Sequence, residues 1–161
     1  MKELNRREFV AAVACAACLC GLGEAGKVLA DDATTQPATQ PSTTLDIGAK
    51  SDYATDGITT TWMKQPNRVA IVRHEGKIYA CTTICPHRRV TINEGTDKNS
   101  FECPRHHSTF DIEGNVTHGP ATRPLIRYAI SVDSNNHLIV DKSQKFDTDQ
   151  WDNPASFVKV D

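Results

Sequence analysis

Two short segments of this chain each place a cysteine next to a histidine. Residues 85–87 read Cys-Pro-His, and after fifteen further residues the segment 103–106 reads Cys-Pro-Arg-His. Thiolate sulfur and imidazole nitrogen are both ligands for iron and zinc. Two loops that each begin with Cys-Pro can meet at one end of a β structure. There they would present two sulfurs and two nitrogens to metal.

The same four side chains could also bind a single zinc ion. Zinc sites usually hold their cysteines two to four residues apart and their histidines likewise. Here each loop mixes one cysteine with one histidine. The spacing therefore favours an iron–sulfur centre and leaves a non-redox zinc-binding module as the less favoured alternative.

The two motifs resemble those of the Rieske [2Fe-2S] family, in which two histidines replace two cysteines on one iron. The resemblance runs from about Asp46 to Asp141. It includes His-His-Ser-Thr-Phe-Asp at 106–111, Gly-Pro-Ala at 119–121 and Pro-Leu at 124–125. It implies an all-β fold, a Rieske-like antiparallel β-sandwich with a small cluster-binding subdomain formed by two loops.

The resemblance also implies the ligands of a [2Fe-2S] cluster. Cys85 and Cys103 would hold the buried iron, and His87 and His106 would hold the outer iron near solvent. The family usually has glycine at two positions of these loops, where this chain has Arg89 and His107. No catalytic residue is expected, because the chain shows no two-histidine, one-carboxylate iron site of an oxygenase.

Family members of high potential differ from this chain at the residues that adjust the cluster. They carry an extra cysteine in each loop, joined as a disulfide, where this chain has Val90 and Arg105. They also carry a serine and a tyrosine whose hydroxyl groups bond cluster sulfurs and favour the reduced state. Ser108 matches the serine, but Phe110 replaces the tyrosine. We expect an intermediate potential, in a family range of about −150 to +300 mV.

The rest of the chain predicts short strands and no long helix. Apolar stretches alternate with turn residues, and Glu75-Gly76 between 68–73 and 77–82 is a hairpin signal. A second pairing is expected around 113–115. A third joins 125–132 to 138–141, and the end from 146 to 160 is expected to pack a last strand or loop against the domain.

The sequence predicts that the chain has three parts: a signal peptide over 1–30, a flexible Thr/Gln/Pro linker over 31–44 and the Rieske domain over 45–161. Adjacent Arg6 and Arg7 before Phe9 resemble a twin-arginine export signal. That route carries folded proteins, as a cofactor inserted in the cytoplasm requires. We expect cleavage after Ala30 and a location in the periplasm or cell envelope, with membrane attachment only if the signal is retained as an anchor.

Charge predicts how a partner would dock. The whole chain has a net charge of −2, yet Arg88, Arg89 and Arg105 fall within the two ligand loops. We expect these three arginines to dock a redox protein that is acidic at its docking face. No nucleic-acid partner is expected. Among the remaining residues, Cys81 is expected to be a buried small side chain, and His107 is left open as a docking group.

Two functions of different kinds fit these observations. The first is an exported one-electron carrier that uses a Rieske [2Fe-2S] cluster. The second is the small Rieske subunit of an exported oxidoreductase, either arsenite-oxidase-like or a quinol-oxidising complex. The missing disulfide and tyrosine count against the quinol-oxidising complex. The sequence names neither the electron donor nor the acceptor.

Overall fold

The computed structural model describes residues 43–160. The predicted signal peptide and residues 31–42 of the predicted linker lie outside the described residues. Among the described residues, no helix is both long and apolar enough to cross a membrane.

Within residues 43–160, eleven strands form two antiparallel sheets, which confirms the all-β prediction. The larger sheet has the order β1-β10-β9-β4-β3-β2, and β11 pairs with β4. Its strands are β1 (Thr44–Ala49), β2 (Gly57–Thr59), β3 (Val69–His74), β4 (Lys77–Thr82), β9 (Arg127–Val132), β10 (His137–Phe146) and β11 (Val158–Lys159). In the described part of the chain, three short 3-10 helices accompany them: η1 (Lys50–Tyr53), η2 (Thr148–Gln150) and η3 (Pro154–Ser156).

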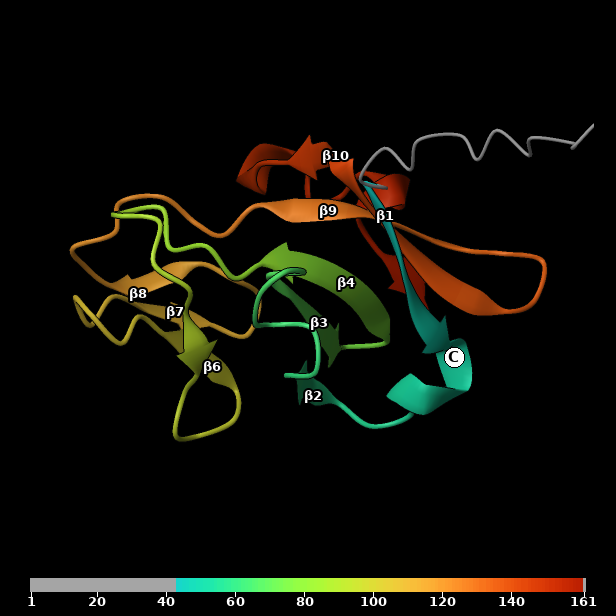
Figure 1. Cartoon of the computed structure of the whole chain (residues 1–161), viewed down its shortest axis with the longest axis horizontal. Coiled ribbons are helices and arrows are strands. Elements are labelled where there is room, and N and C mark those ends of the chain that lie inside the picture. The colour runs from blue at the N-terminus through green and yellow to red at the C-terminus, as the bar shows by residue number, and fades with distance from the viewer. Residues whose placement is uncertain (1–42, 161) are drawn as a thin grey trace, which may run out of the picture. The chain divides into compact units, whose positions relative to one another are not determined.

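The smaller sheet has four short strands in the order β5-β6-β7-β8. They are β5 (Asn93–Glu94), β6 (Ser100–Glu102), β7 (Thr109–Asp111) and β8 (Val116–His118). Figure 1 shows β6, β7 and β8 at one end of the domain, with β1, β9 and β10 toward the other. The smaller sheet and the two Cys/His loops thus form the predicted subdomain.

The β3–β4 hairpin separates two hydrophobic cores. Side chains alternate across a strand, so neighbouring residues point to opposite faces. On β3, Val69 and Ile71 join the core of the larger sheet, whereas Ala70 and Val72 join the core beneath the smaller sheet. Because both faces are buried, the strand is a continuous apolar run.

The three predicted hairpins are confirmed. His74 pairs with Lys77 across the two-residue turn Glu75-Gly76, whose φ angles of 50° and 69° are left-handed, as a type I′ turn requires. Thr109 pairs with His118 around the second turn, and β9 pairs with β10 around the third. The C-terminal segment ends in β11, which pairs with β4 as an added strand.

The C-terminal segment also covers a buried charge. The Arg127 guanidinium lies 3.8 Å from the ring centroid of Tyr79 and 4.0 Å from that of Trp151. Its Nη2 donates to the carbonyl of Glu113 at 3.1 Å. Such cation–π stacking contributes about 0.5–2 kcal/mol per pair. Arg127 therefore links β4 and the C-terminal segment to the β7–β8 turn.

Candidate metal centre

The two ligand loops arise at matching places in the fold. Residues 85–90 follow β4, and the isolated bridge between Ile84 and Thr91 closes their base. Residues 103–108 connect β6 to β7, whose pairing of Glu102 with Thr109 closes the second loop in the same way. Each loop is therefore a tight turn held by a short antiparallel pair.

The backbones of the two loops make the same hydrogen bonds. The N–H of Cys85 donates to the carbonyl of Val90 at 2.8 Å, and the N–H of Arg89 donates back to the carbonyl of Cys85 at 2.8 Å. In the second loop, the N–H of Cys103 donates to the carbonyl of Ser108 at 2.8 Å, and the N–H of His107 donates back to the carbonyl of Cys103 at 2.9 Å. The histidine falls two residues after the cysteine in one loop and three after it in the other.

Arg89 and His107 stand at the two positions where the family usually has glycine. Both have a left-handed backbone, with φ of 58° and 55°. Glycine adopts this conformation at no steric cost, whereas other residues do so at a cost of about 1–2 kcal/mol. The replacements leave the turn conformation in place.

The two cysteines lie at the buried side of the site. Cys85 and Cys103 are buried, and both belong to the core beneath the smaller sheet. Burial raises the pKa of Cys85, and the adjoining thiol of Cys103 raises it further, while backbone N–H groups of His87 and Arg88 lower it. A bound metal ion reverses this, because it stabilises the deprotonated thiolate directly.

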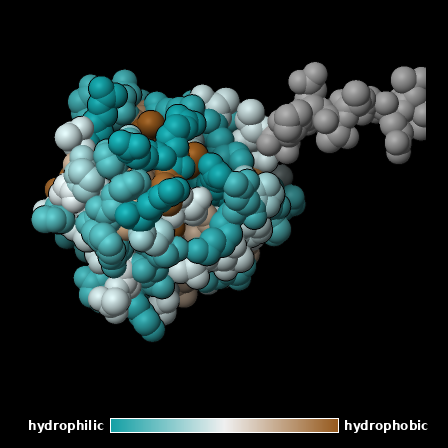
Figure 2. All heavy atoms as spheres, turned by 60° about the vertical axis from the view of Figure 1, so that its left-hand side comes forward, coloured by the Kyte–Doolittle hydropathy of each residue, from teal (hydrophilic) through white to brown (hydrophobic). Residues whose placement is uncertain are grey.

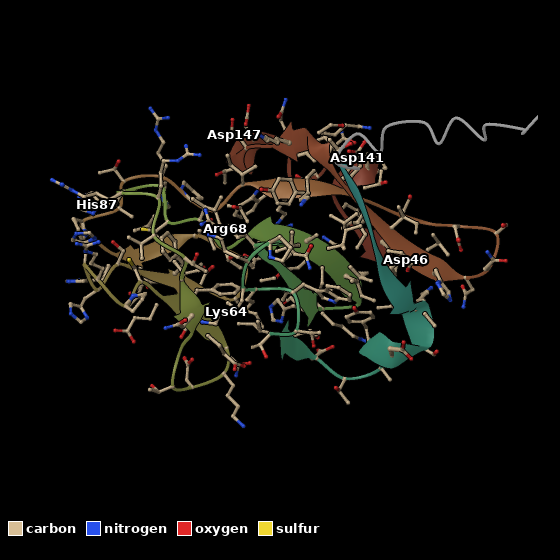
Figure 3. All side chains as sticks on the ribbon, in the orientation of Figure 1. Asp46, Lys64, Arg68, His87, Asp141 and Asp147 are labelled. Atoms are coloured by element: carbon tan, nitrogen blue, oxygen red, sulfur yellow. The ribbon has the colours of Figure 1, made fainter. Side chains whose placement is uncertain are left out.

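The two histidines lie toward the surface. Their rings meet edge to face with centroids 4.7 Å apart. His87 lies at the outer end of the domain, beyond the smaller sheet (Figure 3). Desolvation, followed by the positive charges nearby, lowers the pKa of His106 and so favours the neutral imidazole that a metal requires.

One feature of the rings fits a metal group directly. The Nδ1 atoms of both His87 and His106 are buried and have no hydrogen-bond partner among the described residues. Buried polar atoms in native proteins nearly always have a partner. Two such nitrogens and two buried thiols are the kinds of donor that a centre with two sulfur and two nitrogen ligands uses.

The donor set divides into a thiol pair and an imidazole pair. The thiols of Cys85 and Cys103 adjoin each other, and the rings of His87 and His106 are in contact. A [2Fe-2S] cluster of this family would have two irons, one for each pair. These donor types fit that group.

Ser108 is buried behind the second loop. Its Oγ accepts a hydrogen bond from the N–H of Ala121 at 3.0 Å, which ties the 119–126 connection to the loop. The hydroxyl hydrogen has no acceptor among the described protein atoms and stays available. Phe110 is buried two residues later, at the place of the tyrosine of high-potential members, and offers no donor.

The three arginines that were predicted to dock a partner do not all lie in the same place. All three side chains are exposed. Arg88 and Arg105 lie near enough to His106 to lower its pKa, whereas Arg89 lines a cavity on the side of the first loop. His107, whose role the sequence left open, is exposed, and its Nδ1 lies 3.2 Å from Oε1 of Glu102.

Sequence reasoning missed the contacts made by the 119–126 connection. Nothing in the local pattern signalled that Ala121 would bond Ser108. Arg123, from the same connection, joins Arg89 at a cavity beside the first loop. Cys81 is buried as predicted, and burial raises the pKa of its thiol to about 12.

Comparison with known proteins identifies the family. A model described as "Rieske [2Fe-2S] domain" matches residues 43–129. The chain is 33% identical over 75 residues to the ferredoxin component of an alkene monooxygenase system from Xanthobacter autotrophicus, with 45% of this chain and 62% of that protein covered. It is 35% identical over 74 residues to the iron–sulfur subunit of a menaquinol:cytochrome c reductase from Geobacillus thermodenitrificans, with 43% and 44% covered.

A solved structure is also similar. The plasma-membrane Rieske protein of the cyanobacterium Synechocystis PCC 6803 matches with a TM-score of 0.46 and 29% identity, covering 60% of this chain and 97% of that one. The chain spans between 38% and 62% of the length of the curated relatives it matches. Since the family model covers more than half of the 161 residues, this chain belongs to the Rieske [2Fe-2S] domain family, whose cofactor is a [2Fe-2S] cluster.

Proposed function

We propose that this protein is an exported one-electron carrier of the cell envelope whose cluster is held by Cys85, His87, Cys103 and His106. The single observation that carries the ligand assignment is the pair of buried Nδ1 atoms without partners beside two buried thiols. A [2Fe-2S] cluster supplies reversible uptake of one electron. The protein's part is to bury the thiol side, expose the imidazole side and set the charge around both.

Replacing one ligand tests the assignment. His87→Cys should retain some cluster at a lower midpoint potential, because a thiolate adds a negative charge where a neutral imidazole stood. His118→Cys is the matched control, since His118 is exposed on β8 and is not a proposed ligand. The assignment fails if His87→Cys keeps the wild-type potential, or if both variants shift it equally.

The redox partner would dock at the histidine end through Arg88, Arg89 and Arg105. The three guanidinium groups have no salt-bridge partner among the described residues. Figure 2 brings this end forward and shows mostly hydrophilic residues with few hydrophobic ones between them. A polar, positively charged face suits a transient complex, in which complementary charge chiefly raises the association rate.

The docking proposal is tested by changing all three arginines to glutamine. Electron transfer to an acidic redox protein should slow, and its dependence on ionic strength should flatten, because charge attraction at the surface is screened by salt. The control replaces Lys64, Lys98 and Lys159 by glutamine, which removes the same charge elsewhere on the exposed surface. Equal rates for the arginine variant and wild type at low salt would contradict the proposed docking face.

Export is the part of the proposal that falls outside the described residues. Replacing Arg6 and Arg7 by lysine should leave precursor in the cytoplasm, and the exported protein should begin at Asp31. Export that survives the double replacement would remove the twin-arginine assignment. An intact N-terminus on envelope-located protein would show a retained anchor instead.

A second function, the iron–sulfur subunit of a larger oxidoreductase, is favoured by the likeness to a menaquinol:cytochrome c reductase subunit. The residues within the site favour the carrier. The chain has Phe110 in place of the tyrosine, and Cys81, Cys85 and Cys103 are free thiols in the described residues. Purification of the protein from its native membrane and soluble fractions would distinguish the two. A stable complex with a larger catalytic subunit would replace the carrier proposal.

A further inference from the structure

A cavity of about 340 Å³ lies beside the first ligand loop, and none of its lining residues comes from the second loop. It is bounded by the first loop, the 119–126 connection and the end of β10. Its walls include Cys85 and Pro86 next to the proposed centre, and Lys145 and Asp147 at the far rim. Asp147 lies toward the larger sheet, away from the end of the domain that carries His87 (Figure 3).

The charges around this cavity are unbalanced. Arg89, Arg123 and Lys145 line it, and Asp147 is the one acidic residue among its lining residues. All four side chains are exposed, and none takes part in a salt bridge within the described residues. Three cations from three different segments therefore face one cavity with a net positive charge.

The rest of the wall is largely apolar. Ile84, Pro124, Ile126 and Tyr128 contribute to it. Pockets of about 300–1,000 Å³ are large enough to bury most of a small ligand. A group that suits both parts of the lining has a short apolar stem and ends in an anion. A glutamate side chain has this form, since its methylene groups can lie on the isoleucines while its carboxylate meets the guanidinium groups.

Arg89 connects this cavity to the proposed docking face. It follows Arg88 directly, and Arg88 lies near His106. An acidic segment that lies across the histidine end can therefore continue into the cavity without leaving the protein surface. We propose that the cavity receives a glutamate side chain from an acidic segment of the redox partner. This inference rests on the proposed electron-transfer function and adds a second point of attachment to it.

The test measures binding of a hexaglutamate peptide to the cluster-loaded mature protein by calorimetry at low ionic strength. Arg123→Gln combined with Lys145→Gln should weaken binding about five- to tenfold, the effect of losing two exposed charge pairs. Both residues lie outside the ligand loops, so cluster absorbance should be unchanged. Lys98→Gln combined with Lys159→Gln is the control of equal charge and should leave the affinity within about twofold.

Each of the other possible results of this binding experiment leads to a different conclusion. Equal affinity of wild type and the Arg123/Lys145 variant overturns the cavity inference. If affinity then falls only with Arg88→Gln and Arg105→Gln, docking at the histidine end stands without the cavity. If neither pair of changes has an effect, the docking proposal fails too. Glutarate that binds as tightly as the peptide, through Arg123 and Lys145, would assign the cavity to a free dicarboxylate and overturn the partner assignment.

Discussion

Arg89 and His107 occupy the same position of the two ligand loops, four residues after the cysteine, and each donates its backbone N–H to that cysteine's carbonyl. Their left-handed φ angles of 58° and 55° make the two loops conformational copies of each other. The copies present their histidines at different offsets from the cysteine. The two imidazoles meet edge to face, with ring centroids 4.7 Å apart.

Arg89→Gly should stabilise the protein. It removes the left-handed penalty of about 1–2 kcal/mol and adds back about 0.5–1 kcal/mol of unfolded-chain freedom, for a net gain of up to about 1.5 kcal/mol. Arg88→Gly is the control, because Arg88 does not have a positive φ and should lose about 0.5–1 kcal/mol. Urea midpoints measured anaerobically by circular dichroism compare the two. Equal destabilisation by both variants would contradict the strain at Arg89.

Ser108→Ala should lower both the midpoint potential and the stability. The variant loses the available hydroxyl hydrogen near the centre, and a donor worth about 1 kcal/mol to the reduced state corresponds to about 40 mV. It also leaves the buried N–H of Ala121 without its acceptor, at a cost of about 1–3 kcal/mol. Voltammetry and urea unfolding measure the two effects.

Ser108→Thr is the companion variant, since it keeps the hydroxyl and should keep most of the potential. A potential that is the same in wild type and Ser108→Ala would show that the hydroxyl does not reach the cluster. Phe110→Tyr tests the opposite change and should raise the potential by a similar amount if its hydroxyl reaches a sulfur. If Phe110→Tyr has the midpoint potential of wild type, the absence of tyrosine at position 110 does not determine that potential.

The Asp46–His137 pair should make stability depend on pH. His137 Nδ1 lies 3.0 Å from Oδ2 of Asp46, where it joins β1 to β10. The hydrogen bond with His137 lowers the pKa of Asp46, and the same bond raises the pKa of His137, with Asp133 and Asp52 adding to the rise. The histidine's contribution to the free energy of unfolding is complete below its unfolded pKa of about 6.5. It is lost as pH rises through the higher pKa of the folded state.

The aspartate's contribution to the free energy of unfolding is present above its unfolded pKa of about 3.9. It is lost as pH falls through the lower pKa of the folded state. Both contributions are therefore present between about pH 4 and 6.5. The difference in urea midpoint between wild type and His137→Gln should be largest in that window and should shrink on either side. A difference that does not change with pH would show that the pair is not charged in the folded protein.

The ligand motifs and the three hairpins could be predicted from sequence because their signals are local. The turn Glu75-Gly76 fixes its own hairpin, and each Cys/His loop carries both of its donors within four residues. The pairing of Thr44 with Asp141 joins two strands that lie far apart in the sequence, and no local pattern specifies it. The same holds for Arg127, whose stacking partners Tyr79 and Trp151 come from distant segments.

The cavity beside the first loop illustrates the same limit for the site. Arg89 was visible in the sequence as a loop charge, but Lys145 comes from the end of β10, and only the fold brings it to the same cavity. The conformation of the loops was also beyond the sequence. Positions 89 and 107 carry side chains where glycine is usual, and hydrogen bonds of the turn keep them left-handed despite the steric cost.

The measurement that tests the central claim most directly is the metal and sulfide content of the anaerobically purified protein, read together with the electron paramagnetic resonance of its reduced form. We predict a red-brown protein with two irons and two acid-labile sulfides per chain, and a rhombic signal whose average g value lies below that of the free electron. This follows from a cluster held by two thiolates and two imidazoles. A colourless protein with one zinc ion per chain and no such signal would contradict the account.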